Sequence, residues 1–156
     1  MIFVADCMLG RLARWLRIFG FDVLYFPRIE DGALLGVARR EGRVLLTRDR
    51  GLVERTAGRP ALLVASEKWE DQLVQVLETL GLKDRLAPHT RCLDCNAPLK
   101  PVSRERARNL ASPFVVERGD AFALCPSCGR LYWKGSHTSD MDARMDKIIK
   151  RLRAGS

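Results

Sequence analysis

The chain has 156 residues, of which 47% are hydrophobic and 29% are charged, so it can bury a core and is not disordered throughout. It contains no apolar run of about 18 residues, which excludes a membrane-spanning helix and predicts no membrane partner. Its formal charge of +8, from 27 basic and 19 acidic residues, favours an anionic partner such as nucleic acid, although ordinary solubility charge explains it equally well.

The first 88 residues alternate short apolar runs with amphipathic segments, which is typical of βα units in a parallel sheet. We expect strands at residues 2–6, 22–26, 43–47 and 61–65. We expect helices at residues 9–19, 31–41 and 69–80, with a short helix before the fourth strand. Residues 1–88 are therefore predicted to form a doubly wound α/β domain with a parallel sheet.

The pattern changes near Pro88, where a stretch rich in Cys, Pro and Arg begins. We predict a separate module over residues 89–138, followed by a basic amphipathic helix over residues 139–156. Residues 91–156 hold 13 basic and 7 acidic residues, so most of the positive surplus lies there. If the chain binds nucleic acid, this half is expected to contribute to the affinity.

Two Cys-x-x-Cys pairs, Cys92 with Cys95 and Cys125 with Cys128, are separated by 29 residues (96–124), a spacing that favours one zinc ion held by four thiolates. With no position left for water, such a zinc ion is structural. The alternative is a redox dithiol, but that motif belongs at the start of a helix and leaves the second pair unexplained. The fifth cysteine, Cys7, argues against a disulfide scaffold, so we expect a zinc ribbon in a cytoplasmic protein.

Three aspartates follow predicted strands or open predicted helices: Asp6, Asp31 and Asp49. In a doubly wound sheet these positions lie at the carboxyl edge, where ligands bind. Clustered carboxylates are the oxygen ligands that Mg²⁺ or Mn²⁺ prefers, and such a site can activate water against a phosphate. Helix capping is the alternative for each aspartate separately, because Asp is a favoured N-cap residue.

Basic side chains near these carboxylates are candidates for holding an anionic substrate. Arg11, Arg14 and Arg17 are predicted to lie away from the apolar face of the first helix, and Arg48 adjoins an aspartate. His137 is a further candidate for phosphate binding or proton transfer. The alternative for the arginines is an ordinary solvated face, and for His137 the start of a helix.

The segments 31–38 and 44–49 resemble the second half of PIN-domain ribonucleases, in which an Asp opens a helix and a Thr-x-Asp ends the next strand. The segments 3–17 and 132–137 are similar to the PIN-like RNase family with a C-terminal zinc ribbon, first named for the C-terminal domain of the mutator-seven exonuclease. The resemblance spans about residues 1–140.

This resemblance implies a PIN fold and divalent-metal-dependent cleavage of RNA, with Asp6, Asp31 and Asp49 as the catalytic and Mg²⁺- or Mn²⁺-binding set. Typical PIN nucleases have a fourth acidic residue before the equivalent of Asp31, and no residue here clearly matches it. Glu30 is one candidate, and a site reduced to three carboxylates is the other possibility.

Two functions from different classes follow. The first is a metal-dependent endoribonuclease that uses the carboxylate set, and the second is a non-catalytic RNA-binding module with a degenerate site and a structural zinc ribbon. Aspartyl-phosphate chemistry ranks last, because the phosphatases need a second Asp where this chain has Met8. The oligomeric state is not predicted by any of these patterns.

Overall fold

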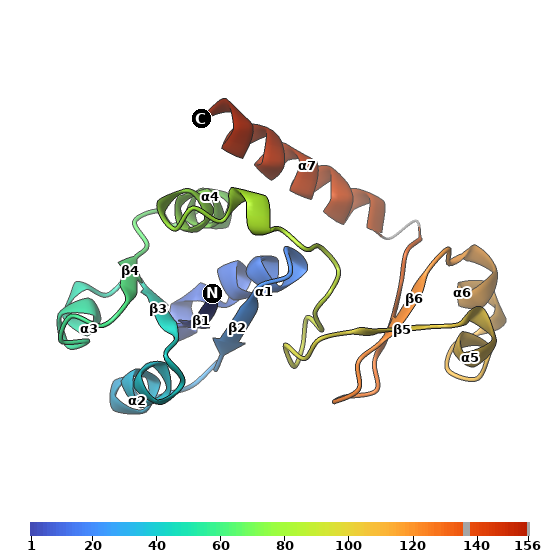
Figure 1. The fold of residues 1–156 in the computed structure, drawn as a ribbon, viewed down its shortest axis with the longest axis horizontal. Coiled ribbons are helices and arrows are strands. Elements are labelled where there is room, and N and C mark those ends of the chain that lie inside the picture. The colour runs from blue at the N-terminus through green and yellow to red at the C-terminus, as the bar shows by residue number, and fades with distance from the viewer. Residues whose placement is uncertain (136–137, 156) are drawn as a thin grey trace. The chain divides into compact units, whose positions relative to one another are not determined.

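The computed structural model describes residues 1–135 and 138–155. These residues fold as two compact units, Met1–His89 and Thr90–Ser156 (Figure 1). No helix in the described residues is long and apolar enough to cross a bilayer.

A parallel sheet forms the centre of the first unit. Its strands are β1 (Ile2–Ala5), β2 (Asp22–Tyr25), β3 (Val44–Thr47) and β4 (Ala61–Leu63), in the order β2-β1-β3-β4. The chain leaves β1 in one direction to form β2 and later returns to the other side of β1 to form β3. The carboxyl ends of β1 and β3 therefore flank a topological switch point, and the predicted parallel α/β sheet is confirmed.

Helices cover both faces of this sheet (Figure 1). On one face, α1 (Gly10–Ile18) and α4 (Trp69–Thr79) pack against each other. On the other face, α2 (Asp31–Glu41) packs on β1 and β3, while the short α3 (Arg50–Glu54) packs on β3 and β4. Two single-turn 3-10 helices, η1 (Cys7–Leu9) and η2 (Lys83–Arg85), complete the first unit.

Apolar side chains on these elements explain why the first unit folds. Phe3 and Val4 on β1 are fully buried on opposite faces of the strand, as are Leu45 and Leu46 on β3. The chain after α1 turns at Gly20, where φ is 93° and an added Cβ would lie 2.1 Å from the Ala87 carbonyl oxygen. Only glycine fits such a position without moving the backbone.

The second unit contains an antiparallel sheet in the order β5-β6-β7, built from β5 (Lys100–Val102), β6 (Phe122–Leu124) and β7 (Leu131–Trp133). Two short helices, α5 (Arg104–Arg108) and α6 (Pro113–Arg118), lie between β5 and β6 in the chain. The expected C-terminal helix is present as α7 (Thr138–Ala154). The sequence predicted neither α5 nor α6, because helices of 5 and 6 residues are shorter than two turns and leave no apolar period to detect.

Candidate functional site

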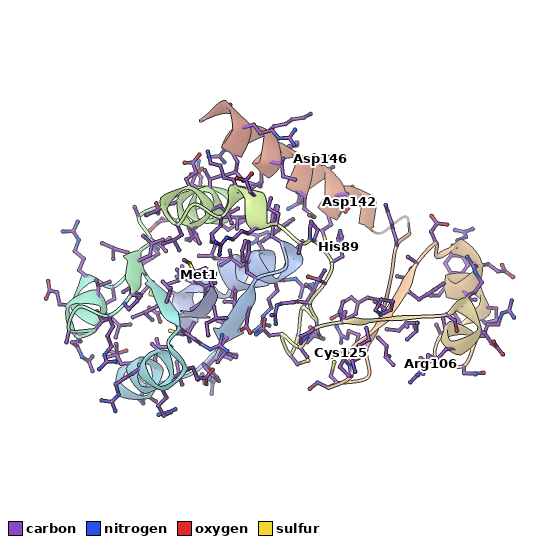
Figure 2. All side chains as sticks on the ribbon, in the orientation of Figure 1. Met1, His89, Arg106, Cys125, Asp142 and Asp146 are labelled. Carbon is purple, nitrogen blue, oxygen red and sulfur yellow. The ribbon has the colours of Figure 1, made fainter. Side chains whose placement is uncertain are left out.

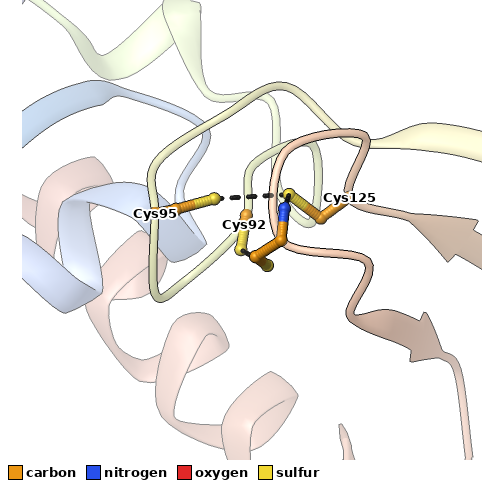
Figure 3. A group of neighbouring side chains, drawn as sticks. Cys92, Cys95 and Cys125 are labelled. Atoms are coloured by element: carbon orange, nitrogen blue, oxygen red, sulfur yellow. Dashed lines mark hydrogen bonds between the residues drawn. The ribbon is translucent and has the colours of Figure 1, made fainter.

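The first cysteine pair lies on a tight turn. The amide of Asn96 donates to the carbonyl oxygen of Cys92 at 3.0 Å, and the amide of Cys92 donates to the carbonyl oxygen of Ala97 at 2.9 Å. Asn96 has a φ of 67°, in the left-handed region that Asn adopts more readily than most residues. This turn directs the side chains of Cys92 and Cys95 toward the same place (Figure 3).

The second cysteine pair repeats the same turn. The amide of Gly129 donates to the carbonyl oxygen of Cys125 at 3.0 Å, and the amide of Cys125 donates to the carbonyl oxygen of Arg130 at 2.9 Å. Gly129 has a φ of 74°, so it occupies the position that Asn96 holds in the first turn. The amide of Cys128 also lies 3.4 Å from the Cys125 sulfur and donates to it. Asn96 went unrecognised in the sequence, although its place directly after a Cys-x-x-Cys pair is the signal.

The four sulfur atoms form one cluster. They lie within 4.8 Å of one another, with Sγ–Sγ distances of 3.6 Å for Cys92 and Cys128 and 3.3 Å for Cys95 and Cys125 (Figure 3). Sulfurs about 2.3 Å from a tetrahedral zinc ion are about 3.8 Å apart, so the cluster fits that ion. The predicted four-cysteine metal site is therefore confirmed, and soft thiolate ligands in a four-sulfur set are those that zinc prefers.

Tyr132 on β7 supports this cluster. Its hydroxyl oxygen accepts a hydrogen bond from the Leu93 amide at 3.0 Å, and its proton is then available to the Cys92 sulfur at 3.1 Å. Burial on its own would raise the pKa of Cys92, but hydrogen bonds from the Cys95 backbone amide and the Tyr132 hydroxyl lower that pKa to about 6. These donors favour the thiolate, which is the metal-binding form. The sequence analysis did not assign Tyr132 this role, because its effect depends on the fold of the ribbon.

At the carboxyl edge of the first sheet, Thr47 joins two of the three aspartates. Its hydroxyl donates to Asp6 Oδ2 at 2.8 Å and accepts from the Asp49 amide at 3.0 Å. The amide of Asp6 donates to the carbonyl oxygen of Leu46 at 2.9 Å, which ties the end of β1 to β3. Asp6 is 8% exposed and Thr47 is fully buried. The switch point therefore positions Asp6 and Asp49 around one buried hydroxyl group.

The capping alternative holds for one aspartate. Asp49 caps α3, because its Oδ1 accepts from the amides of Gly51 at 2.7 Å and Leu52 at 3.2 Å. Asp6 precedes η1 without any side-chain capping bond, and Asp31 is the first residue of α2 rather than its N-cap. Helix capping accounts for the position of Asp49, whereas it does not account for Asp6 or Asp31.

Asp31 has a different partner. Its Oδ2 lies 2.8 Å from Nη1 of Arg55, in an ion pair whose side chains are 55% and 52% exposed respectively. Glu30, the candidate fourth carboxylate, is the exposed N-cap residue of α2. Among the residues that the structure describes, the four cysteines are the only group of metal-ligating side chains found close together. Asp6 and Asp49 are thus linked at the edge, while Asp31 is engaged by an arginine.

The arginines of α1 differ from one another. Arg11 and Arg14 are exposed, as expected for side chains that could contact a substrate. The guanidinium carbon of Arg11 lies 5.8 Å from the ring centroid of Trp69, which itself stacks on Trp15 with centroids 4.4 Å apart. A cation–π contact restricts Arg11 to one side of the helix, so its charge is held in a defined place.

Arg17 was placed wrongly by the sequence. It is 7% exposed, and its Nε and Nη2 donate to the carbonyl oxygen of Val23 at 3.0 and 2.8 Å, because the last turn of α1 packs on β2. It is a structural residue. Arg48 forms an ion pair with Glu67 at 3.1 Å, and the predicted residue His137 lies outside the described residues.

The sequence was also compared with known proteins. The model of the Mut7-C RNAse domain family matches residues 1–145, a stretch that includes both compact units, all three aspartates and all four clustered cysteines. No curated protein and no solved structure matches the chain.

Proposed function

Because the chain belongs to the Mut7-C RNAse domain family, we propose that it hydrolyses RNA phosphodiester bonds with the help of Mg²⁺ or Mn²⁺. In this proposal the first unit is a PIN-like nuclease domain, and its site is the carboxyl edge of the parallel sheet. Asp6, Asp31 and Asp49 are the proposed catalytic residues, and the zinc cluster is structural.

The arrangement of Asp6, Thr47 and Asp49 is the observation that carries this proposal. Two carboxylates from neighbouring strands meet beside one hydroxyl at the switch point, where α/β sheets bind their ligands. Carboxylate oxygens are the ligands that hard divalent cations take, so these residues fit Mg²⁺ or Mn²⁺. When bound, such an ion activates a water molecule and stabilises charge on the scissile phosphate.

The chain's own groups have defined tasks in this scheme. The Thr47 hydroxyl donates to Asp6 and so orients a carboxylate that is almost completely buried. Arg11, Arg14 and Arg48 lie on segments that leave the same edge of the sheet, and guanidinium groups match phosphate oxygens in geometry. We assign them, together with His137, to positioning the RNA strand.

Cleavage of labelled single-stranded RNA by the purified chain tests the proposal. The reactions contain Mn²⁺, Mg²⁺ or no added divalent ion, and the zinc content is measured in each sample. Asp6→Asn and Asp49→Asn are expected to abolish the metal-dependent cleavage, whereas Asp84→Asn, at an exposed site on η2, is the matched control and retains it. A circular RNA substrate shows whether cleavage is internal, as proposed. Cleavage that is equal in all variants would reveal a contaminating nuclease.

The second candidate function is a non-catalytic RNA-binding module. The Asp31–Arg55 ion pair favours it, because this arginine neutralises the carboxylate that a metal site would use. RNA binding without cleavage under both metal ions, by protein with full zinc content, would establish this module in place of the nuclease.

A further inference from the structure

The second unit carries an ordered insert that the zinc cluster does not require. It comprises residues 103–119, with α5 and α6 packed on each other between β5 and β6 (Figure 1). Ala107 on α5, Val116 on α6 and Phe122 on β6 form a small buried core. Arg104 donates to the carbonyl oxygens of Val116 and Gly119, the latter at 2.9 Å, which fixes the end of α6. The insert is therefore a defined surface.

This surface carries uncompensated positive charge. Residues 100–118 contain five basic residues and two acidic ones. Arg106 and Arg108 on α5 and Arg118 on α6 are exposed, and within the described part of the chain none of the three has an acidic partner (Figure 2 labels Arg106). Arg104 differs from them, because the backbone carbonyls already occupy its guanidinium group.

An exposed aromatic ring lies beside this charge. Phe114, on the first turn of α6, is 58% exposed, and the guanidinium carbon of Arg118 lies 4.2 Å from its ring centroid. Leu110, between the two helices, is 47% exposed. A phenylalanine in this position contributes little to the small core of the insert. A ring stacked with a guanidinium group is a ready platform for an unpaired nucleobase.

We propose that this insert binds single-stranded RNA. An unpaired base stacks at Phe114 and Arg118, while Arg106 and Arg108 contact the neighbouring phosphates. RNA is favoured over other anionic partners because it alone combines flat bases for the aromatic platform with a regular row of phosphates for the arginines. This inference rests on the proposed function, since it assigns the place where the same class of substrate is held.

The charge is tested by fluorescence anisotropy with a short labelled single-stranded RNA. The full chain carries Asp6→Asn and Asp49→Asn, so the RNA stays intact. Arg106→Gln combined with Arg108→Gln is expected to weaken binding roughly tenfold and to reduce the salt slope of log K by about 2, one for each lost phosphate contact. The matched control is Arg39→Gln combined with Arg40→Gln, which removes the same charge from the last turn of α2 and leaves affinity unchanged. Equal weakening by both pairs would overturn the proposal.

The stacking is tested at Phe114. Phe114→Leu keeps an apolar side chain but removes the ring, and should weaken single-stranded RNA binding by about fivefold or more. Phe114→Trp should retain or increase the affinity. A fully paired duplex, whose bases are not available, should be insensitive to both changes. Unchanged single-stranded RNA affinity in Phe114→Leu would overturn the proposal, as would a preference for phosphatidylserine vesicles that depends on Phe114 while RNA binding does not.

Zinc content and circular dichroism establish that each variant is folded. The binding assay and the cleavage assay fail separately, so the two ideas remain distinguishable. Loss of RNA binding in the insert variants, combined with no cleavage by the wild-type chain, supports the insert surface and rejects the nuclease. Metal-dependent cleavage by the wild-type chain, combined with unchanged binding by the insert variants, does the reverse.

Discussion

The two compact units differ in what holds them together. The first has a continuous apolar core, with Phe3, Leu16, Leu45 and Leu73 fully buried between the sheet and its helices. In the second, between Thr90 and Trp133, the only buried apolar side chains besides two of the cysteines are Ala107, Val116 and Phe122. A core that small does not overcome the conformational entropy of the chain, so metal binding must contribute most of the stability.

This difference also separates the two proposed tasks. The nuclease site lies at one edge of a sheet that apolar packing makes rigid, which is what a catalytic arrangement requires. The proposed RNA-binding insert lies between two cysteine turns that hold its ends in place. Loss of zinc is therefore expected to affect RNA binding more than the geometry of the carboxylate edge.

The largest expected effect is the loss of zinc. Cys125→Ser removes one of four thiolates, and binding of structural zinc contributes on the order of 10 kcal/mol, so the ribbon should unfold while residues 1–89 remain folded. Hydrogen exchange followed by mass spectrometry, resolved by peptide, measures the protection of each unit. Cys7→Ser, outside the cluster, is the control and should retain both zinc and protection. Protection lost equally in both units would contradict the comparison.

A smaller effect is expected from opening the core of the first unit. Leu45→Ala removes a fully buried side chain at the centre of β3 and should lower the free energy of unfolding by about 2–5 kcal/mol. Thermal unfolding, followed together with zinc release, shows which unit is affected. Leu110→Ala, where the side chain is 47% exposed, should change stability by less than about 0.5 kcal/mol. Zinc release at a much lower temperature in Leu45→Ala would show that the units do not unfold independently.

The same contrast explains how much the sequence predicted. In the first unit, unbroken apolar runs and helical periodicity located the strands and helices to within a residue or two, as at α2 (Asp31–Glu41). In the second, cysteine spacing predicted the metal ligands, because coordination chemistry demands particular residues at particular intervals. The short helices α5 and α6 were missed, since tertiary packing rather than periodicity stabilises them.

The site shows the same division between local and long-range signals. Asp6 and Asp49 were identified because the end of a parallel strand is visible in the sequence. Their link through the side chain of Thr47, and the ion pair between Asp31 and Arg55, join residues far apart in the chain. Such partners depend on the packing of whole elements, and for that reason the buried position of Arg17 also escaped prediction.

Tyr132 offers a sharper test of the second unit. Tyr132→Phe keeps the ring but removes the hydroxyl that lies 3.1 Å from the Cys92 sulfur, and loss of such outer-shell donors lowers metal affinity by about 10- to 100-fold. Competition with a chromophoric zinc chelator measures this affinity. Tyr25→Phe, whose hydroxyl donates to the Cys7 carbonyl oxygen in the first unit, is the matched control and should leave zinc affinity unchanged. Equal zinc affinity in wild type and Tyr132→Phe would mean that the four sulfurs alone determine binding.

The smallest effect on stability is expected at Arg55. Because apolar packing holds the first unit, the exposed Arg55–Asp31 ion pair should contribute less than about 1 kcal/mol, and Arg55→Gln should unfold nearly as the wild type does. If the carboxylate edge binds a divalent ion, removal of this positive charge leaves Asp31 uncompensated, so the Mn²⁺ concentration needed for half-maximal cleavage should fall. Arg59→Gln, an exposed arginine nearby in the sequence, controls for net charge. A large loss of stability in Arg55→Gln would show that charge at this edge serves the fold, whereas a lower Mn²⁺ requirement with unchanged stability would show that it serves the site.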